Sequence, residues 1–126
     1  MHYKKSILLS LTIFSLSGCD NDSTESGEHA QNKTPGLSTG KALFAKNCAS
    51  CHGRGAKGTD QGPPFIHKVY EPSHHGDTSF YRAVEKGVRA HHWKFGDMPP
   101  IKRITRSETT EIISYIRYIQ GKAGVF

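Results

Sequence analysis

The stretch GKALFAKNCASCHG, residues 40–53, decides how the rest of the chain is interpreted. It closes on two cysteines, Cys48 and Cys51, which are separated by two residues and followed directly by His52. A zinc site would need two further ligands at comparable spacing, and no other cysteine follows in the chain. A redox pair of the thioredoxin kind would not need the histidine. The pattern therefore indicates a site that uses both thiols and the imidazole together.

Cysteines and a histidine at this spacing are typical of the attachment site of a c-type haem. Two thiols separated by two residues can reach the two vinyl groups on one edge of a porphyrin and form thioethers. The adjoining His52 can then lie under the iron as its proximal ligand. The sequence therefore predicts one covalent haem c, held by Cys48 and Cys51. A second haem is not expected, because Cys-x-x-Cys-His occurs once.

The quoted stretch resembles the opening of a class I cytochrome c, and the resemblance extends over residues 37–126. It implies an all-α fold of three or more helices around one haem, and a single-electron carrier rather than an enzyme. It also implies that Gly40 and Phe44 lie where the N-terminal helix contacts the C-terminal helix. The hydrophobic content of only 35% fits this interpretation, because the porphyrin would supply part of the core.

Local signals predict where the first two helices begin and end. The first is expected to start at Ser38 or Thr39, whose side chains can accept hydrogen bonds from free backbone N–H groups. A later helix is expected over residues 78–86, with Asp77 as its cap and Gly87 as its end.

The C-terminal helix has the clearest pattern. Thr105-Arg-Ser-Glu108 is the sequence of a capping box, which satisfies two backbone donors at a helix start. Tyr118 sits at the family's aromatic position near the end of this helix. Apolar residues then recur at three- and four-residue steps, which predicts one buried stripe, at Ile112, Tyr115, Ile116 and Ile119.

The second axial ligand of the iron would separate electron transfer from catalysis or gas binding. Met98, within Gly-Asp-Met-Pro-Pro, resembles the distal methionine of the family. His52/Met98 ligation predicts a comparatively high reduction potential, since a thioether favours the ferrous state relative to a second imidazole. The alternative is a haem enzyme or gas sensor with an open or bis-histidine iron. The histidines that compete with Met98 are His67, His74, His75, His91 and His92.

Two further residues are expected to support the haem. Gly62-Pro63 resembles the family segment in which a proline carbonyl accepts the Nδ1–H of the proximal histidine, although Pro64 follows directly. Trp93 could donate its indole N–H to a haem propionate, or could be a core or interface aromatic.

The adjacent pairs His74-His75 and His91-His92 are unusual for so small a domain. Neighbouring residues on a helix point apart, so the two members of a pair cannot both bind one iron. Exposed loop histidines are the simplest interpretation. The alternatives are a replacement haem ligand, a pH-dependent docking surface, or a copper site that would make this a copper-handling haem module.

Residues 1–18 resemble a bacterial lipoprotein signal peptide. Lys4 and Lys5 precede an apolar run that is too short to span a membrane. The run ends at Leu-Ser-Gly-Cys19, which resembles the processing site where the cysteine is lipidated and becomes the new N-terminus. An ordinary secretory signal is the alternative. Asp20 resembles an inner-membrane retention signal of enteric bacteria, so the outer membrane is the less favoured location.

Residues 19–36 are almost devoid of apolar side chains, which predicts a flexible tether before a domain at 37–126. The whole chain has a formal net charge of +6, and the domain alone carries +7, which favours acidic partners or anionic lipid. We expect redox partners at the periplasmic face of the inner membrane, such as a quinol-oxidising complex, a terminal oxidase or a periplasmic reductase. Nucleic acid is not expected, since no basic helix is interleaved with aromatics.

Overall fold

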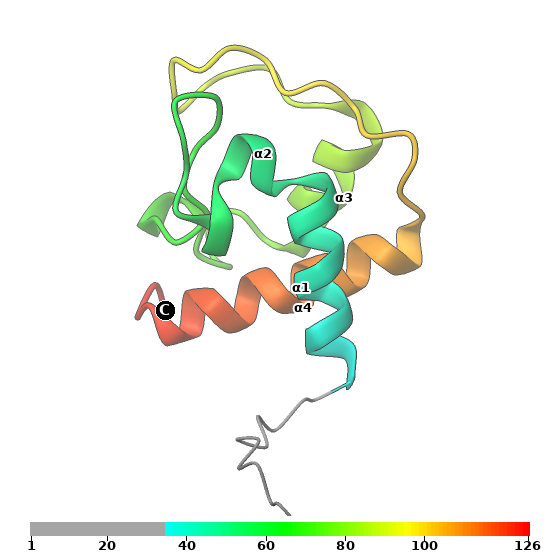
Figure 1. Cartoon of the computed structure of the whole chain (residues 1–126). Coiled ribbons are helices and arrows are strands. Elements are labelled where there is room, and N and C mark those ends of the chain that lie inside the picture. Colours follow the sequence, from blue (N-terminus) through cyan, green and yellow to red (C-terminus); the bar gives the residue numbers. More distant parts are fainter. Residues whose placement is uncertain (1–34) are drawn as a thin grey trace, which may run out of the picture.

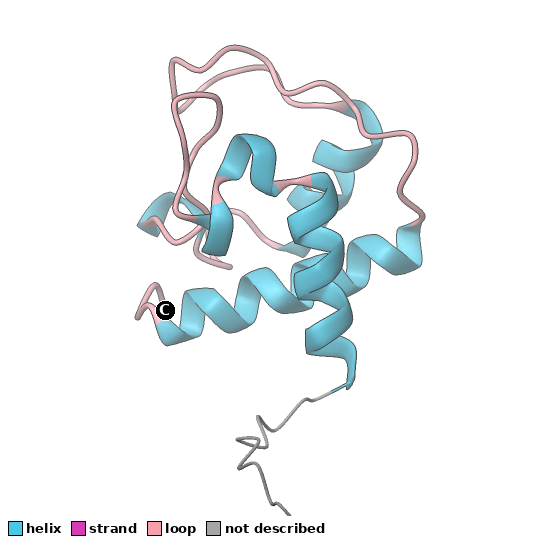
Figure 2. Ribbon diagram, in the orientation of Figure 1, coloured by secondary structure: helices cyan, strands magenta, loops and turns pink. Residues whose placement is uncertain are grey.

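The computed structural model describes residues 35–126, and in this part of the chain helices are joined by long loops without a β-strand (Figures 1 and 2). An isolated bridge pairs Val88 with Met98. The predicted all-α fold is confirmed. The elements in chain order are α1 (Pro35–Asn47), α2 (Ala49–His52), η1 (Arg54–Ala56), η2 (Lys68–Tyr70), α3 (Asp77–Lys86) and α4 (Arg106–Lys122).

The predicted signal peptide and its lipidation site Cys19 lie outside the described residues. So does the predicted tether, except for its last two residues, Pro35 and Gly36, which form the start of α1. None of the helices between residues 35 and 126 combines the length and apolar character that crossing a membrane requires.

Helices α1 and α4 cross each other, as Figure 1 shows, and their contact is centred on a buried glycine. A Cβ atom at Gly40 would overlap the carbonyl oxygen of Glu111 in α4. One turn later, Phe44 is only 1% exposed, and its ring lies 5.5 Å from the ring of Tyr115. The expected contact between the first and last helices is confirmed, and it depends on the absence of a side chain at Gly40.

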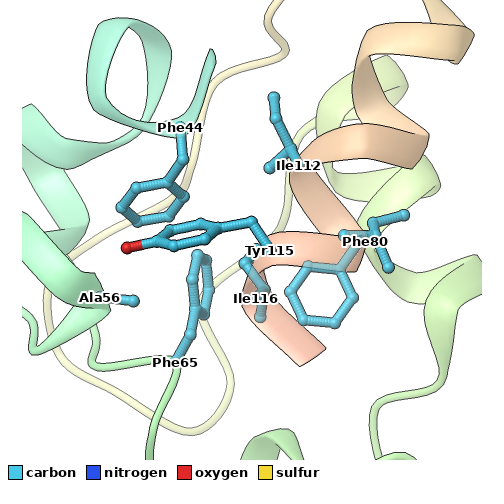
Figure 3. Packing of buried hydrophobic residues seen from close by; sticks show 8 residues of the cluster. Phe44, Ala56, Phe65, Phe80, Ile112, Tyr115 and Ile116 are labelled. Carbon is cyan, nitrogen blue, oxygen red and sulfur yellow. The ribbon is translucent and has the colours of Figure 1, made fainter. Parts of the chain in front are cut away.

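The hydrophobic core is a small aromatic cluster between α4 and the segments packed on it (Figure 3). The ring of Phe65 lies 6.3 Å from Phe44 and 5.4 Å from Phe80, in edge-to-face contact with both. Such contacts add to the free energy of area burial by roughly 0.5–1.5 kcal/mol each. The remaining members of the cluster are Ala56, Ile112, Ile113, Tyr115 and Ile116.

Two helix starts differ from prediction. Helix α1 begins at Pro35 rather than at Ser38 or Thr39, because the fixed φ of proline suits the first turn of a helix. The N-cap of α3 is Gly76 rather than Asp77. Asp77 is the first residue of the helix, and no side chain makes a capping hydrogen bond there. The carboxylate of Asp77 instead accepts a hydrogen bond from Arg117 Nε at 2.8 Å, so a tertiary contact has replaced the local cap.

Other helix predictions agree with the structure. Gly87 ends α3 with φ 76°, a left-handed conformation that favours glycine. The stripe on α4 is buried at Ile112, Tyr115 and Ile116 and partly buried at Ile119. Tyr118, in contrast, is 48% exposed, since its helical position lies to the side of this stripe.

The predicted capping box at the start of α4 is present. The Thr105 side chain accepts from the backbone N–H of Glu108, whose carboxylate accepts from the N–H of Thr105. We expect Thr105→Ala to lower the free energy of unfolding by about 1 kcal/mol, measured by denaturant unfolding. Ser114→Ala, at an exposed site in the same helix, is the control and should change it little. Equal losses in both variants would contradict a role for the cap.

Candidate functional site

The two cysteines and His52 lie at the junction of α1 and α2. The backbone N–H of Cys48 still bonds to Phe44 of α1, while its carbonyl oxygen accepts from the N–H groups of Cys51 and His52. A single turn of helix therefore sets the spacing of the two thiols and the imidazole. All three side chains line one cavity of about 1060 Å³.

Neither cysteine forms a disulfide within the described residues. Burial raises the pKa of Cys48 to about 11, and nearby Arg103 opposes this shift only in part. The thiol is therefore protonated at neutral pH in the haem-free chain. A redox-active pair needs a thiolate of lowered pKa, so the environment of Cys48 does not suit disulfide exchange.

His52 is held by a hydrogen bond that decides which ring nitrogen is free. Its Nδ1 lies 3.0 Å from the carbonyl oxygen of Pro63, and a carbonyl can only accept, so Nδ1 carries the proton. Nε2 is left with its lone pair. Burial lowers the pKa of His52, while the bond to Pro63 raises it, and the ring stacks on Phe65 at 4.1 Å. The result is a fixed, neutral imidazole, which is the form that binds metals.

The loop after α2 folds back to bring Pro63, rather than Pro64, to His52. The N–H of Gly58 bonds to the His52 carbonyl oxygen at 2.7 Å, and the N–H of Phe65 bonds to Ala56 at 2.9 Å. These bonds fix both ends of the loop, which explains why the Pro63 carbonyl meets the ring.

Met98 lies on a different segment but lines the same cavity. Its backbone N–H and carbonyl oxygen pair with those of Val88 at 2.9 Å each. A Cβ atom at Gly87 would overlap the Met98 carbonyl oxygen, so this close approach also requires glycine. The end of α3 thus positions Met98, which is half-buried.

The cavity wall is mainly apolar, and Trp93 and Tyr70 add polar aromatic groups to it. Phe80 of α3 and three isoleucines of α4 contribute to it. Trp93 also lines the cavity, and its Nε1 is buried without a hydrogen-bond partner in the described part of the protein. Burial raises the pKa of the neighbouring Tyr70 hydroxyl, and the Trp93 indole lowers this pKa in part. The indole N–H and the Tyr70 hydroxyl are nevertheless not in hydrogen-bonding geometry. A ligand with acceptor oxygens would satisfy the indole.

Tyr70 is a cavity residue that the sequence did not indicate. It lies in the short turn η2, where no periodic pattern operates, and only its place in the fold reveals it. His67, one of the competing histidines, lies outside the cavity lining and packs edge-on against Trp93 at 5.0 Å. The other four line the cavity.

These features together fit haem c. The cavity is slightly larger than the roughly 300–1,000 Å³ usual for ligand sites. Its wall offers two thiols for thioethers, a neutral imidazole with one free nitrogen, a thioether sulfur and an unsatisfied N–H donor.

The family model described as cytochrome c matches residues 37–120, from early in α1 to near the end of α4. No curated protein and no solved structure matched the chain.

Proposed function

The chain belongs to the cytochrome c family, and on this premise we propose that it carries single electrons through one covalent haem c with His52 and Met98 as axial ligands. Membership itself establishes the class I fold, the covalent haem c and a role in electron transfer. The observation that supports the ligands is the single cavity lined by both thiols, His52 and Met98.

Bound haem supplies an iron that gains or loses one electron. The protein's part is to hold that iron in a constant environment. The Pro63 carbonyl orients His52, and the backbone pairing with Val88 fixes the segment of Met98. The apolar wall restricts water at the site. Because both proposed ligands are fixed by backbone contacts, little has to move when an electron arrives.

Trp93 is proposed to donate its indole N–H to a haem propionate. Its Nε1 is buried in the cavity wall with no acceptor in the described structure, and burial of an unpaired donor costs roughly 1–3 kcal/mol. A propionate oxygen would remove that cost and at the same time orient the cofactor.

Met98→Ala tests the axial ligation. In haem-loaded protein we expect complete loss of the weak ferric absorption band that methionine–iron bonding gives, together with a lower reduction potential. Both are measured on the purified protein, by absorption spectroscopy and by redox titration. Lys94→Ala, on the same loop but exposed and outside the cavity, is the control and should keep the band. An unchanged spectrum in the Met98 variant would reject Met98 as ligand.

We further propose that Cys19 carries lipid and that residues 19–36 tether the domain at the periplasmic face of the inner membrane. The sequence of residues 1–19 supports export and lipidation. The partners would be redox proteins such as a quinol-oxidising complex, a terminal oxidase or a periplasmic reductase. The domain at 37–126 carries a formal net charge of +7, which favours acidic docking faces, with binding that weakens as salt is raised.

A further inference from the structure

Three histidines from two separate loops meet beside the cavity. His74 and His75 precede α3, and His92 lies between α3 and Met98. Each offers a ring nitrogen, and these three nitrogens all lie within 4.8 Å of one another. The two adjacent pairs are in loops rather than on a helix, so the restriction expected for helical neighbours does not apply here.

The spacing of two of these nitrogens suits a metal ion. Nε2 of His74 and Nε2 of His92 are 3.3 Å apart. Zinc–nitrogen bonds of about 2.0–2.1 Å in a tetrahedral site place neighbouring ligand nitrogens roughly 3.3–3.4 Å apart. One ion could therefore bind both rings with little movement of either side chain.

The third ring is oriented in the way that metal-binding histidines usually are. Nδ1 of His75 lies 2.7 Å from the carbonyl oxygen of Val69. Because that oxygen can only accept, Nδ1 carries the proton and Nε2 keeps its lone pair. A bond from the second ring nitrogen to a backbone carbonyl fixes both the tautomer and the ring plane of a metal ligand.

Backbone contacts fix the loop that carries His74 and His75. The carbonyl oxygen of Glu71 accepts the N–H groups of both residues at 3.0 and 2.8 Å. From α4, Arg117 Nη2 donates to the His75 carbonyl oxygen at 2.6 Å. This part of the cluster is therefore held by the fold, independently of any ion.

The loop that carries His92 is fixed as well. The pairing of Val88 with Met98 closes its base, and the N–H of Ala90 donates to Asp97 Oδ1 at 2.8 Å. This loop, too, is therefore held by contacts within the fold.

We propose that His74, His75 and His92 bind one divalent transition-metal ion of the Cu²⁺ or Zn²⁺ kind. Imidazole nitrogens suit these ions, whereas Mg²⁺ and Ca²⁺ prefer oxygen ligands. Three ligands leave at least one coordination position for water or an external ligand. The site lies on the wall of the haem cavity but uses neither His52 nor Met98, so it adds a second metal centre to the domain.

Titration calorimetry of the haem-loaded mature protein, with CuCl₂ and with ZnCl₂ in separate runs, tests the proposal. We expect one ion per protein for each metal, with Cu²⁺ binding more tightly than Zn²⁺. His92→Gln and the double variant His74→Gln/His92→Gln should weaken binding at least about 100-fold, since removing one or two of three ligands leaves too few donors. The haem absorption spectrum should be the same in all these proteins, which shows that each variant is folded.

His91→Gln is the matched control. This histidine neighbours His92 and is exposed, but its Nδ1 donates to the Arg89 carbonyl oxygen at 2.8 Å and it is not one of the three clustered donors. It should bind both metals within about threefold of the original affinity. Absence of saturable binding to the unaltered protein, or undiminished binding to the double variant, would overturn the proposal. Loss of binding in His91→Gln would overturn the choice of ligands.

Discussion

Replacing both Cys48 and Cys51 with serine should leave the protein with no covalently bound haem. Acidified organic solvent should then extract all of its pigment, whereas the unaltered protein should retain it. The reason is chemical, because a thioether to a vinyl group needs sulfur and a serine hydroxyl is a far weaker nucleophile. Haem staining of a denaturing gel and intact-mass spectrometry measure the result.

Cys19→Ser is the control for that experiment. It removes the one remaining cysteine of the chain, which is proposed to carry lipid, and leaves both thiols of the cavity in place. Haem should remain covalent in this variant, while the mass of the lipid is lost. Haem that stays with the denatured Cys48/Cys51 double variant would contradict the attachment. A thiol open to alkylation in the mature unaltered protein would contradict the assignment of all three cysteines.

The features that the sequence predicted well depend only on residues that are close together in the chain. The capping box needs only Thr105 and Glu108, three residues apart, and the stripe on α4 needs only the helical period. The helical turn that spaces Cys48, Cys51 and His52 needs only five consecutive residues. Each of these patterns determines its own local geometry, so contacts with the rest of the fold change that geometry little.

Contacts between distant segments could not be predicted in the same way. Asp77 was expected to cap α3, yet its carboxylate accepts a hydrogen bond from Arg117, 40 positions away in the sequence. Pro63 was predicted correctly from its resemblance to the family segment, but the packing of the loop on α2 is what selects it over Pro64. Tyr70 was not predicted, because it reaches the cavity only through the fold.

The histidine cluster shows the same limit at the proposed metal site. The sequence shows two separate pairs of histidines, and nothing local indicates that they meet. Their meeting depends on Arg117, which holds one loop from α4, and on the pairing of Val88 with Met98, which closes the other. The exposed-loop interpretation, which the sequence favoured, described their place in the chain but not their proximity.

Gly40→Ala should destabilise the folded protein more than the addition of a single methyl group normally does. The new Cβ would overlap the Glu111 carbonyl oxygen and lie 3.1 Å from the Cβ of Tyr115. Neither neighbour is the end of a flexible side chain, so α1 and α4 would have to separate. Separation would loosen the buried contact of Phe44 with Tyr115. Overpacking of this kind costs typically about 1–3 kcal/mol and occasionally more, and we expect about 3 kcal/mol here.

The free energy of unfolding, measured with denaturant on the haem-loaded protein, checks this value, and the melting temperature should fall by roughly 10–20 °C. Gly121→Ala, in α4, is the matched control, since apart from the adjoining backbone of α4 no described atom lies within 4 Å of a Cβ placed there. The higher helix propensity of alanine should make that variant neutral or up to about 1 kcal/mol more stable. If Gly40→Ala behaved like Gly121→Ala, the close crossing of α1 and α4 could not be what requires a glycine at position 40.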